Sequence, residues 1–222
     1  KKRDSGMRAG RTARIQYRLH DTAPIACDIR DILPVRISIV QARTADSDDY
    51  KSLLAQYHYL GFDMTVGENI KYMVYSRQGR LLACLLFGSS AWACEPRDRY
   101  VGWDRAARRA NLICTTNNTR FLVLPWVRVP HLASHILSQI CRRIGADWQQ
   151  KYGHPLYLLE TFVEQERFKG TCYKAANWIH VGETTGRSRN DRYNTLQVPI
   201  KDIYLYPLRR DFKRKLGHVD LG

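Results

Sequence analysis

Residues 120–153, RFLVLPWVRVPHLASHILSQICRRIGADWQQKYG, decide the expected fold, because a buried strand leads directly into a long amphipathic helix. The strand-like run is interrupted at Pro125, where we expect a bulge or an edge position since proline cannot donate to a β-ladder. The apolar residues behind it share one helical face: Leu132, Ile136, Leu137, Ile140 and Ile144. With Pro130 at its start and Gly153 at its end, this pattern predicts a helix over residues 131–152.

Strand and helix signals continue on both sides of this stretch. The upstream signals are a strand at 36–40, a helix that starts after Asp46 and Ser47 and ends at Gly61, a hairpin of 70–76 with 80–88 around Gln78-Gly79, and a short helix at 104–112. The downstream signals are strands at 155–163, 179–185 and 198–208, a short helix at 168–178 and a basic helical end at 209–217. Together they predict an α/β (α+β) fold with a mixed sheet and a long central helix.

Composition divides the chain into three parts. Residues 1–33 are interpreted as a basic arm or linker, residues 34–208 as the α/β domain with a basic insert at 89–119, and residues 209–222 as a basic tail. The opening KKRDSG is not typical of a natural start, so we expect further sequence upstream.

The overall composition is that of a globular protein. Hydrophobic residues make up 44% and charged residues 26% of the 222 residues, and the longest apolar run, 81–87, is far shorter than the ~20 residues of a membrane helix. No apolar segment follows the basic N-terminal residues, which excludes a secretory signal. The six cysteines show no C-x-x-C spacing and are expected to be reduced, with Cys84 and Cys141 in the core. We therefore expect a cytoplasmic protein without membrane contact.

The charge balance points to a polyanionic partner. Lys and Arg outnumber Asp and Glu by 36 to 21, for a net charge of +15. Nucleic acid is the leading hypothesis, with DNA favoured over RNA, although solvated surface charge or an acidic protein partner would give the same balance. The candidate contacts are basic side chains: Arg97, Arg99, Arg105, Arg108, Arg109, Arg120, Arg128, Lys169, Lys174, Arg187, Arg189 and Arg192. Asn117 and Asn118 are candidates for base edges or for a turn, and Trp92 and Trp103 for base stacking.

Glu160 is the first candidate for catalysis. It lies within the apolar run LYLLETFV, where a carboxylate is costly to bury unless it is paired or used. It is either a general base or one half of a buried ion pair with Arg120, Arg128 or Lys174. Cys172 and Tyr173 are candidates to assist, and the pKa of Cys172 would be lowered beside Lys169 at a helix N-terminus. A packed cysteine is the alternative.

A metal site is not expected. His131 and His135 have the i, i+4 spacing of two metal ligands, but the sequence supplies no nearby third ligand and no glutamate of the zincin type. We interpret them as cap-region and surface histidines.

The order of elements resembles that of the GCN5-related N-acyltransferases. Residues 122–129 would match the strand that opens into that family's coenzyme A loop, 131–152 its long helix, 156–163 the next strand, and 173–181 (YKAANWIHV) the segment that follows. The resemblance implies an N-acyltransferase-like domain at 34–208, with Glu160 beside the reaction cleft. The family's pyrophosphate loop is glycine-rich, whereas residues 128–134 (RVPHLAS) contain no glycine and include Pro130, so no cofactor is expected.

Longer phrases resemble the DruA family, which takes its name from the Druantia anti-phage system. They are YHYLG (57–61), NNTRFLVLPWVRVPHLAS (117–134), LETFVEQERFKGTCYKAANWIHVGETTGRSRNDR (159–192) and KDIYLYPL (201–208). The resemblance implies bacterial defence islands or mobile elements as context, with defence-system partner proteins. Members of that family are typically longer, with an N-terminal helix-turn-helix-like segment that this sequence does not show.

Two functions follow as hypotheses. The first is a nucleic-acid-binding component of an anti-phage defence or mobile-element system. The alternative is an enzyme, transferase-like or nucleic-acid-processing, that uses Glu160 as base in an acyltransferase-like cleft.

Overall fold

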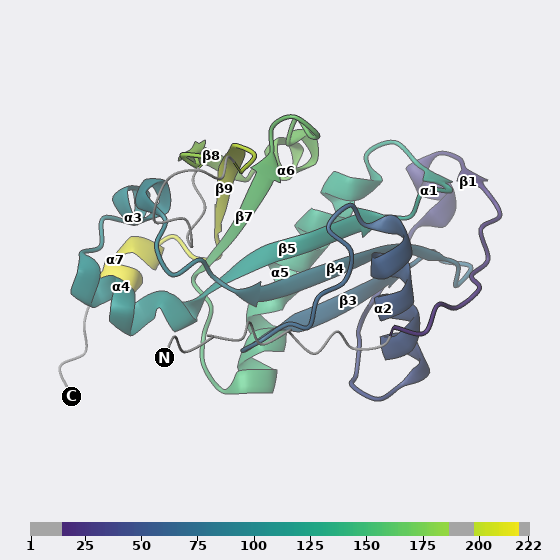
Figure 1. Cartoon of the computed structure of the whole chain (residues 1–222), viewed down its shortest axis with the longest axis horizontal. Helices are drawn as coiled ribbons and strands as arrows, with labels where there is room; N and C mark the ends of the chain where they lie inside the picture. The colour runs from purple at the N-terminus through teal and green to yellow at the C-terminus, as the bar shows by residue number, and fades with distance from the viewer. Residues whose placement is uncertain (1–14, 187–197, 218–222) are drawn as a thin grey trace, which may run out of the picture.

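The fold is built around a mixed seven-stranded sheet. The computed structural model describes residues 15–186 and 198–217 (Figure 1). The strand order is β2-β3-β4-β5-β7-β9-β8, with bounds β2 (Arg36–Ile39), β3 (Ile70–Tyr75), β4 (Leu81–Ser89), β5 (Thr115–Val123), β7 (Leu158–Glu164), β8 (Ile179–Glu183) and β9 (Lys201–Pro207). The helices are α1 (Ile29–Ile32), α2 (Ala45–Tyr57), α3 (Glu95–Val101), α4 (Arg105–Asn111), α5 (Leu132–Tyr152), α6 (Thr171–Ala175) and α7 (Phe212–Gly217), with a 3-10 turn at Leu112–Cys114.

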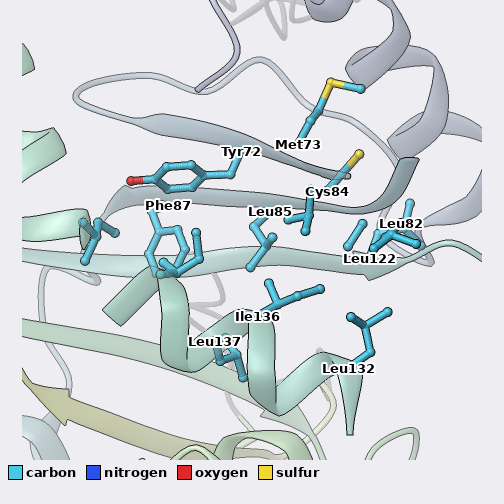
Figure 2. Packing of buried hydrophobic residues seen from close by; sticks show 14 of the residues in the cluster. Tyr72, Met73, Leu82, Cys84, Leu85, Phe87, Leu122, Leu132, Ile136 and Leu137 are labelled. Atoms are coloured by element: carbon cyan, nitrogen blue, oxygen red, sulfur yellow. The ribbon is translucent and has the colours of Figure 1, made fainter. Parts of the chain in front are cut away.

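Helix α5 is the predicted long helix, and it packs behind the sheet in the view of Figure 1. Its apolar face is buried, and Leu132 and Ile136 point toward the strands in Figure 2, whereas Met73 and Cys84 point away from this helix. The helix ends where Gly153 takes a left-handed backbone with φ 79°, as is usual for a glycine C-cap. The predicted face and end of this helix are confirmed.

Helix α2 covers the opposite face of the sheet, in front of it in Figure 1. Tyr50 is fully buried and donates its hydroxyl to the carbonyl of Leu85 in β4 at 2.9 Å. The helix starts earlier than the sequence pattern indicated, because Thr44 rather than Asp46 or Ser47 accepts the first amide, from Ser47. It also ends at Tyr57, before Gly61.

The predicted hairpin joins β3 to β4. Gly79 has φ 81°, and its N–H donates to the carbonyl of Ser76, so the turn closes where Gln78-Gly79 predicted it. In the described chain all six cysteines are free, and the predicted burial of Cys84 and Cys141 is confirmed.

Strand β5 begins at Thr115, five residues before the predicted strand. Asn117 and Asn118 therefore lie inside the strand, and their interpretation as turn residues is wrong. Strand β5 ends at Val123, and Pro125 lies in the turn that follows. After this turn, β6 (Val127–Arg128) pairs in parallel with β1 (Ile25–Ala26) outside the main sheet. The proline is thus placed where no ladder hydrogen bond is required.

Strands β5 and β7 are parallel neighbours only at one end. They pair over Thr115–Asn117 and Leu158–Glu160 and then separate, as Figure 1 shows. β7 continues in antiparallel pairing with β9, and β5 in antiparallel pairing with β4. The sheet therefore opens between two strands in its middle.

The segment between β4 and β5 folds into two short helices. Helix α4 matches the predicted helix at 104–112, with Asp104 as its N-cap, whereas α3 was not predicted. Helix α7 packs against α4, and Asn111 donates its side-chain amide to the carbonyl of Leu216. Within the described residues no helix has the length and apolarity needed to cross a membrane.

Candidate functional site

A cavity of about 440 Å³ occupies the opening between β5 and β7. We call it the β5–β7 cavity. The residues that line it come from five places. They are the end of α2 and the two residues after it (Tyr57, His58, Tyr59), β5 (Asn118, Thr119, Phe121, Leu122, Val123), β7 (Thr161, Phe162, Val163), the segment that leads into and through the start of α6 (Phe168, Lys169, Gly170, Thr171, Cys172, Tyr173), and α5 (Ala133). Its wall is mostly aromatic and aliphatic, with a small number of polar groups, which is typical of a ligand pocket.

Tyr173 is the best-positioned polar group in this cavity. Its hydroxyl donates to Asn118 Oδ1 at 2.7 Å, and Asn118 in turn donates its amide to the carbonyls of Leu86 and Arg120. Burial raises the pKa of Tyr173, so the phenol stays protonated at neutral pH. Gly170 allows α6 this close to the sheet, because a Cβ there would lie 2.5 Å from the hydroxyl of Tyr204.

Cys172 and His58 also line the cavity, and both are neutral at physiological pH. Burial raises the pKa of Cys172 to about 11, which contradicts the expected lowering beside Lys169. The exposed ammonium of Lys169 does not offset the desolvation of the thiolate. Burial, together with Arg120, lowers the pKa of His58 to about 4, and its Nδ1 accepts from the N–H of Leu60.

Glu160 does not face the β5–β7 cavity. Its side chain is 0% exposed, and it accepts from Arg97 Nη1 at 2.7 Å and from the N–H of Ala91 at 2.6 Å. Thr161 lines the cavity, whereas the contacts of Glu160 with Arg97 and Ala91 direct its side chain toward the β4–β5 segment. Burial raises the pKa of Glu160, and Arg97 and the Ala91 amide oppose that rise. Glu160 is therefore one half of a buried ion pair, and its partner is Arg97 rather than Arg120, Arg128 or Lys174.

Arg97 is also 0% exposed, so its assignment as a nucleic-acid contact is wrong. Besides Glu160 it contacts Asp98 Oδ1, which accepts from Arg97 Nη2 at 2.9 Å and from Trp103 Nε1 at 2.9 Å. Arg108 donates to Asp98 Oδ2 at 2.7 Å. Trp103 is buried against this group rather than available for base stacking. These residues form one network that fixes α3 and α4 to β7.

The end of the molecule formed by α3, α4 and α7 carries exposed positive charge. Within the described residues the following cations make no ion pair: Arg105 and Arg109 of α4, and Arg210, Lys213 and Lys215 in and before α7. Lys213 lies over the ring of Tyr100 in α3 at 4.5 Å. We call this surface the α4–α7 basic face. The charges of RRDFKRKLG were visible in the sequence, but nothing in it indicated that they pack beside α4.

The family comparison covers most of the chain. The family described as Druantia protein DruA matches residues 2–201. The chain belongs to the DruA family. It is therefore a component of a Druantia anti-phage defence system, and membership implies other proteins of that system as partners. No curated protein matches it.

Solved structures confirm the expected N-acyltransferase-like fold of this DruA family member. The spermidine N-acetyltransferase from Vibrio cholerae, in complex with CoA and spermine, superposes with a TM-score of 0.52 at 7% sequence identity, covering 78% of this chain and 95% of that one. A putative acetyltransferase from Acinetobacter baylyi gives a TM-score of 0.50 at 8% identity, covering 78% and 91%. At these identities the likeness establishes the fold alone.

The acyltransferase fold implies coenzyme A, and the loop that would hold its phosphates does not fit that group in this DruA chain. Pro130 has no N–H, the N–H of Leu132 is donated to the carbonyl of Val129, and His131 takes a left-handed backbone with φ 64°. A glycine-rich loop brings backbone amides close to phosphate oxygens, whereas this loop has no glycine, has no N–H at Pro130, and has the N–H of Leu132 already donated. We assign no step to coenzyme A.

The remaining predicted residues of the DruA chain fall into three groups. Arg99, Arg105, Arg109, Arg128, Lys169 and Lys174 are exposed, although Arg99 pairs with Glu95. Arg120 and Asn117 are half-buried and Asn118 is buried; Arg120 donates to the carbonyls of Gly61 and Thr119. Asn118 therefore cannot reach a base edge. Arg187, Arg189 and Arg192 lie outside the described residues.

His131 and His135 belong to no metal-competent cluster among the described residues.

Proposed function

We propose that this DruA family member binds nucleic acid through the α4–α7 basic face. The observation that carries the proposal is the packing of α7 against α4, which joins cations of two segments about a hundred residues apart in the sequence into one surface. Contacts of this kind neutralise backbone phosphates and make affinity depend on salt.

Two features support this face over the other basic residues. The cations of α4 and α7 that make no ion pair in the described chain remain available, whereas Arg97, Arg108 and Arg99 are committed to Glu160, Asp98 and Glu95. Asp211 offsets part of the charge, since it pairs with Arg209 and Arg214. The net excess on this face is still positive.

The test is a fluorescence-anisotropy titration of the full chain with single-stranded DNA, duplex DNA and RNA at several salt concentrations. Removing two phosphate contacts with Arg105→Ala and Arg109→Ala should reduce the magnitude of the log–log salt slope by about 1.5–2 and weaken binding. The matched control is Lys169→Ala with Lys174→Ala, two exposed cations around α6. Equal losses in the two double variants would contradict a specific role of the α4–α7 basic face.

The β5–β7 cavity supports a second candidate, an enzyme that uses Tyr173 and Cys172. Glu160 is not available as its base, because Arg97 and Ala91 occupy both carboxylate oxygens. The Tyr173 hydroxyl donates its only proton to Asn118 Oδ1, so its oxygen can instead accept a hydrogen bond from a bound ligand. Ligands that raise the melting temperature of the wild type but not of Tyr173→Phe would support this candidate. Equal shifts in both proteins would contradict the role of Tyr173.

A further inference from the structure

A second cavity, also of about 440 Å³, lies beside α4 where β4 ends and β5 begins. We call it the α4 cavity. The residues that matter for the argument are Glu68, Trp92, Arg109, Ile113 and Trp148. Arg109 belongs to this cavity and to the α4–α7 basic face, so the two adjoin. The β5–β7 cavity shares none of these residues.

Large apolar side chains are exposed at the α4 cavity. Trp92 is 56% exposed and Ile113 is 54% exposed. An indole exposed to water lacks the favourable free energy that burial of its apolar surface would provide. A flat ring beside a cavity is also a surface on which another ring can stack. Trp92 makes no ring contact with any described residue, whereas the exposed rings of Tyr59 and Phe168 contact each other.

The wall of the α4 cavity also holds a polar group without a partner. Trp148 is 1% exposed, and its Nε1–H has no hydrogen-bond acceptor among the described residues. A buried donor without an acceptor is costly, so such a group is usually paired by a ligand or by water. Glu68 contributes a carboxylate, one oxygen of which accepts from His154 at 2.8 Å, and can accept a further donor.

We propose that the α4 cavity takes one unpaired nucleobase of a strand bound to the α4–α7 basic face. This inference rests on the proposed function. Trp92 stacks on the base, Trp148 Nε1 donates to an acceptor on its edge, and Arg109 contacts a phosphate of the same strand. The charge of the adjoining face favours a nucleotide over a neutral aromatic ligand. A base inside a duplex is stacked and cannot enter, so binding favours single strands.

The experiment measures the Kd of the full chain for a single-stranded oligonucleotide, for the matching duplex and for adenosine monophosphate. Trp92→Ala should weaken single-strand binding about tenfold, because the ring on which the base stacks is lost, and should leave duplex binding unchanged. The matched control is Phe168→Ala, which removes an exposed aromatic ring at the β5–β7 cavity and should bind as the wild type does. Melting temperatures of both variants establish that they fold.

The outcomes separate the two proposals. If the wild type binds no nucleic acid, the proposed function and this inference both fail. If it binds with a steep salt slope but Trp92→Ala binds equally well, the inference fails and the proposed function stands. A loss in Phe168→Ala instead would move the base to the β5–β7 cavity, and adenosine monophosphate binding as tightly as the strand would indicate a free-nucleotide site; either result overturns the inference.

Discussion

Arg97 of α3 and Arg105 of α4 lie in the same charged segment, and the structure puts them to opposite uses. Arg97 is fully buried between Glu160 and Asp98. Arg105 is exposed and makes no ion pair in the described chain. In the sequence the two arginines look alike, since each has acidic and aromatic neighbours.

The difference shows that the number of arginines in a sequence overestimates how many of them are exposed and available to bind a partner. A buried guanidinium must be satisfied by carboxylates and carbonyls, and Arg97 has both, with Ala91 accepting at 2.7 Å. Its role is to hold α3, and through Asp98 and Arg108 also α4, against β7. The exposed cations of α4 are therefore presented on a rigidly attached helix.

The sharpest way to break this comparison is Glu160→Gln. The substitution keeps the size of the side chain but removes the fully buried one of the two carboxylates that pair with Arg97, and leaves only Asp98. We expect a loss of about 3–5 kcal/mol in the free energy of unfolding, measured by urea denaturation. Arg105→Ala is the control and should leave the midpoint unchanged. A Glu160→Gln protein as stable as the wild type would show that the ion pair does not hold the segment.

Arg108→Ala should have an intermediate effect. Its guanidinium is mostly buried and donates to Asp98 at 2.7 Å, while Trp103 and Arg97 continue to donate to the same carboxylate. We expect a loss of about 1–2 kcal/mol in urea denaturation. The salt slope for nucleic acid should not change, and a reduced slope would assign Arg108 to the α4–α7 basic face instead.

The pH dependence of stability tests the same network. Burial alone would raise the pKa of Asp98, but hydrogen bonds from Arg108, Trp103 and Arg97 lower it below the usual 3.8. Stability from this group is therefore complete above pH ~4 and is lost as the pH falls through the lowered pKa of the folded state. The stability difference between the wild type and Asp98→Asn should shrink between about pH 5 and pH 3. A constant difference across this range would mean that Asp98 titrates alike in both states.

The smallest change in stability is expected for Arg105→Ala, which should stay within about 0.5 kcal/mol of the wild type. Its affinity for nucleic acid should still fall, and the magnitude of its salt slope should drop by about 0.9, because one phosphate contact is lost. Anisotropy and urea denaturation on the same sample check both values. A destabilised variant with unchanged affinity would reverse the roles assigned to Arg97 and Arg105.

Local patterns predicted the elements of the fold better than the site. The apolar spacing of α5, the Gln78-Gly79 turn and the short helix at 104–112 each depend on residues close in sequence, and all three are confirmed. The cost of burying a carboxylate correctly marked Glu160 as paired or used, but its partner was expected among Arg120, Arg128 and Lys174. An ion pair between residues 63 positions apart depends on the path of the whole chain.

The sequence by itself determined the strand and helix periods, the resemblance to the DruA family and the excess of positive charge. Only the tertiary structure decided that β5 and β7 separate after three paired residues, that Glu160 faces Arg97 rather than the cavity, and that α7 packs beside α4. The physical reason is the distance along the sequence over which each interaction acts. Hydrophobic periodicity and helix capping involve residues a few positions apart, whereas burial and ion pairing depend on which distant segments the fold brings into contact.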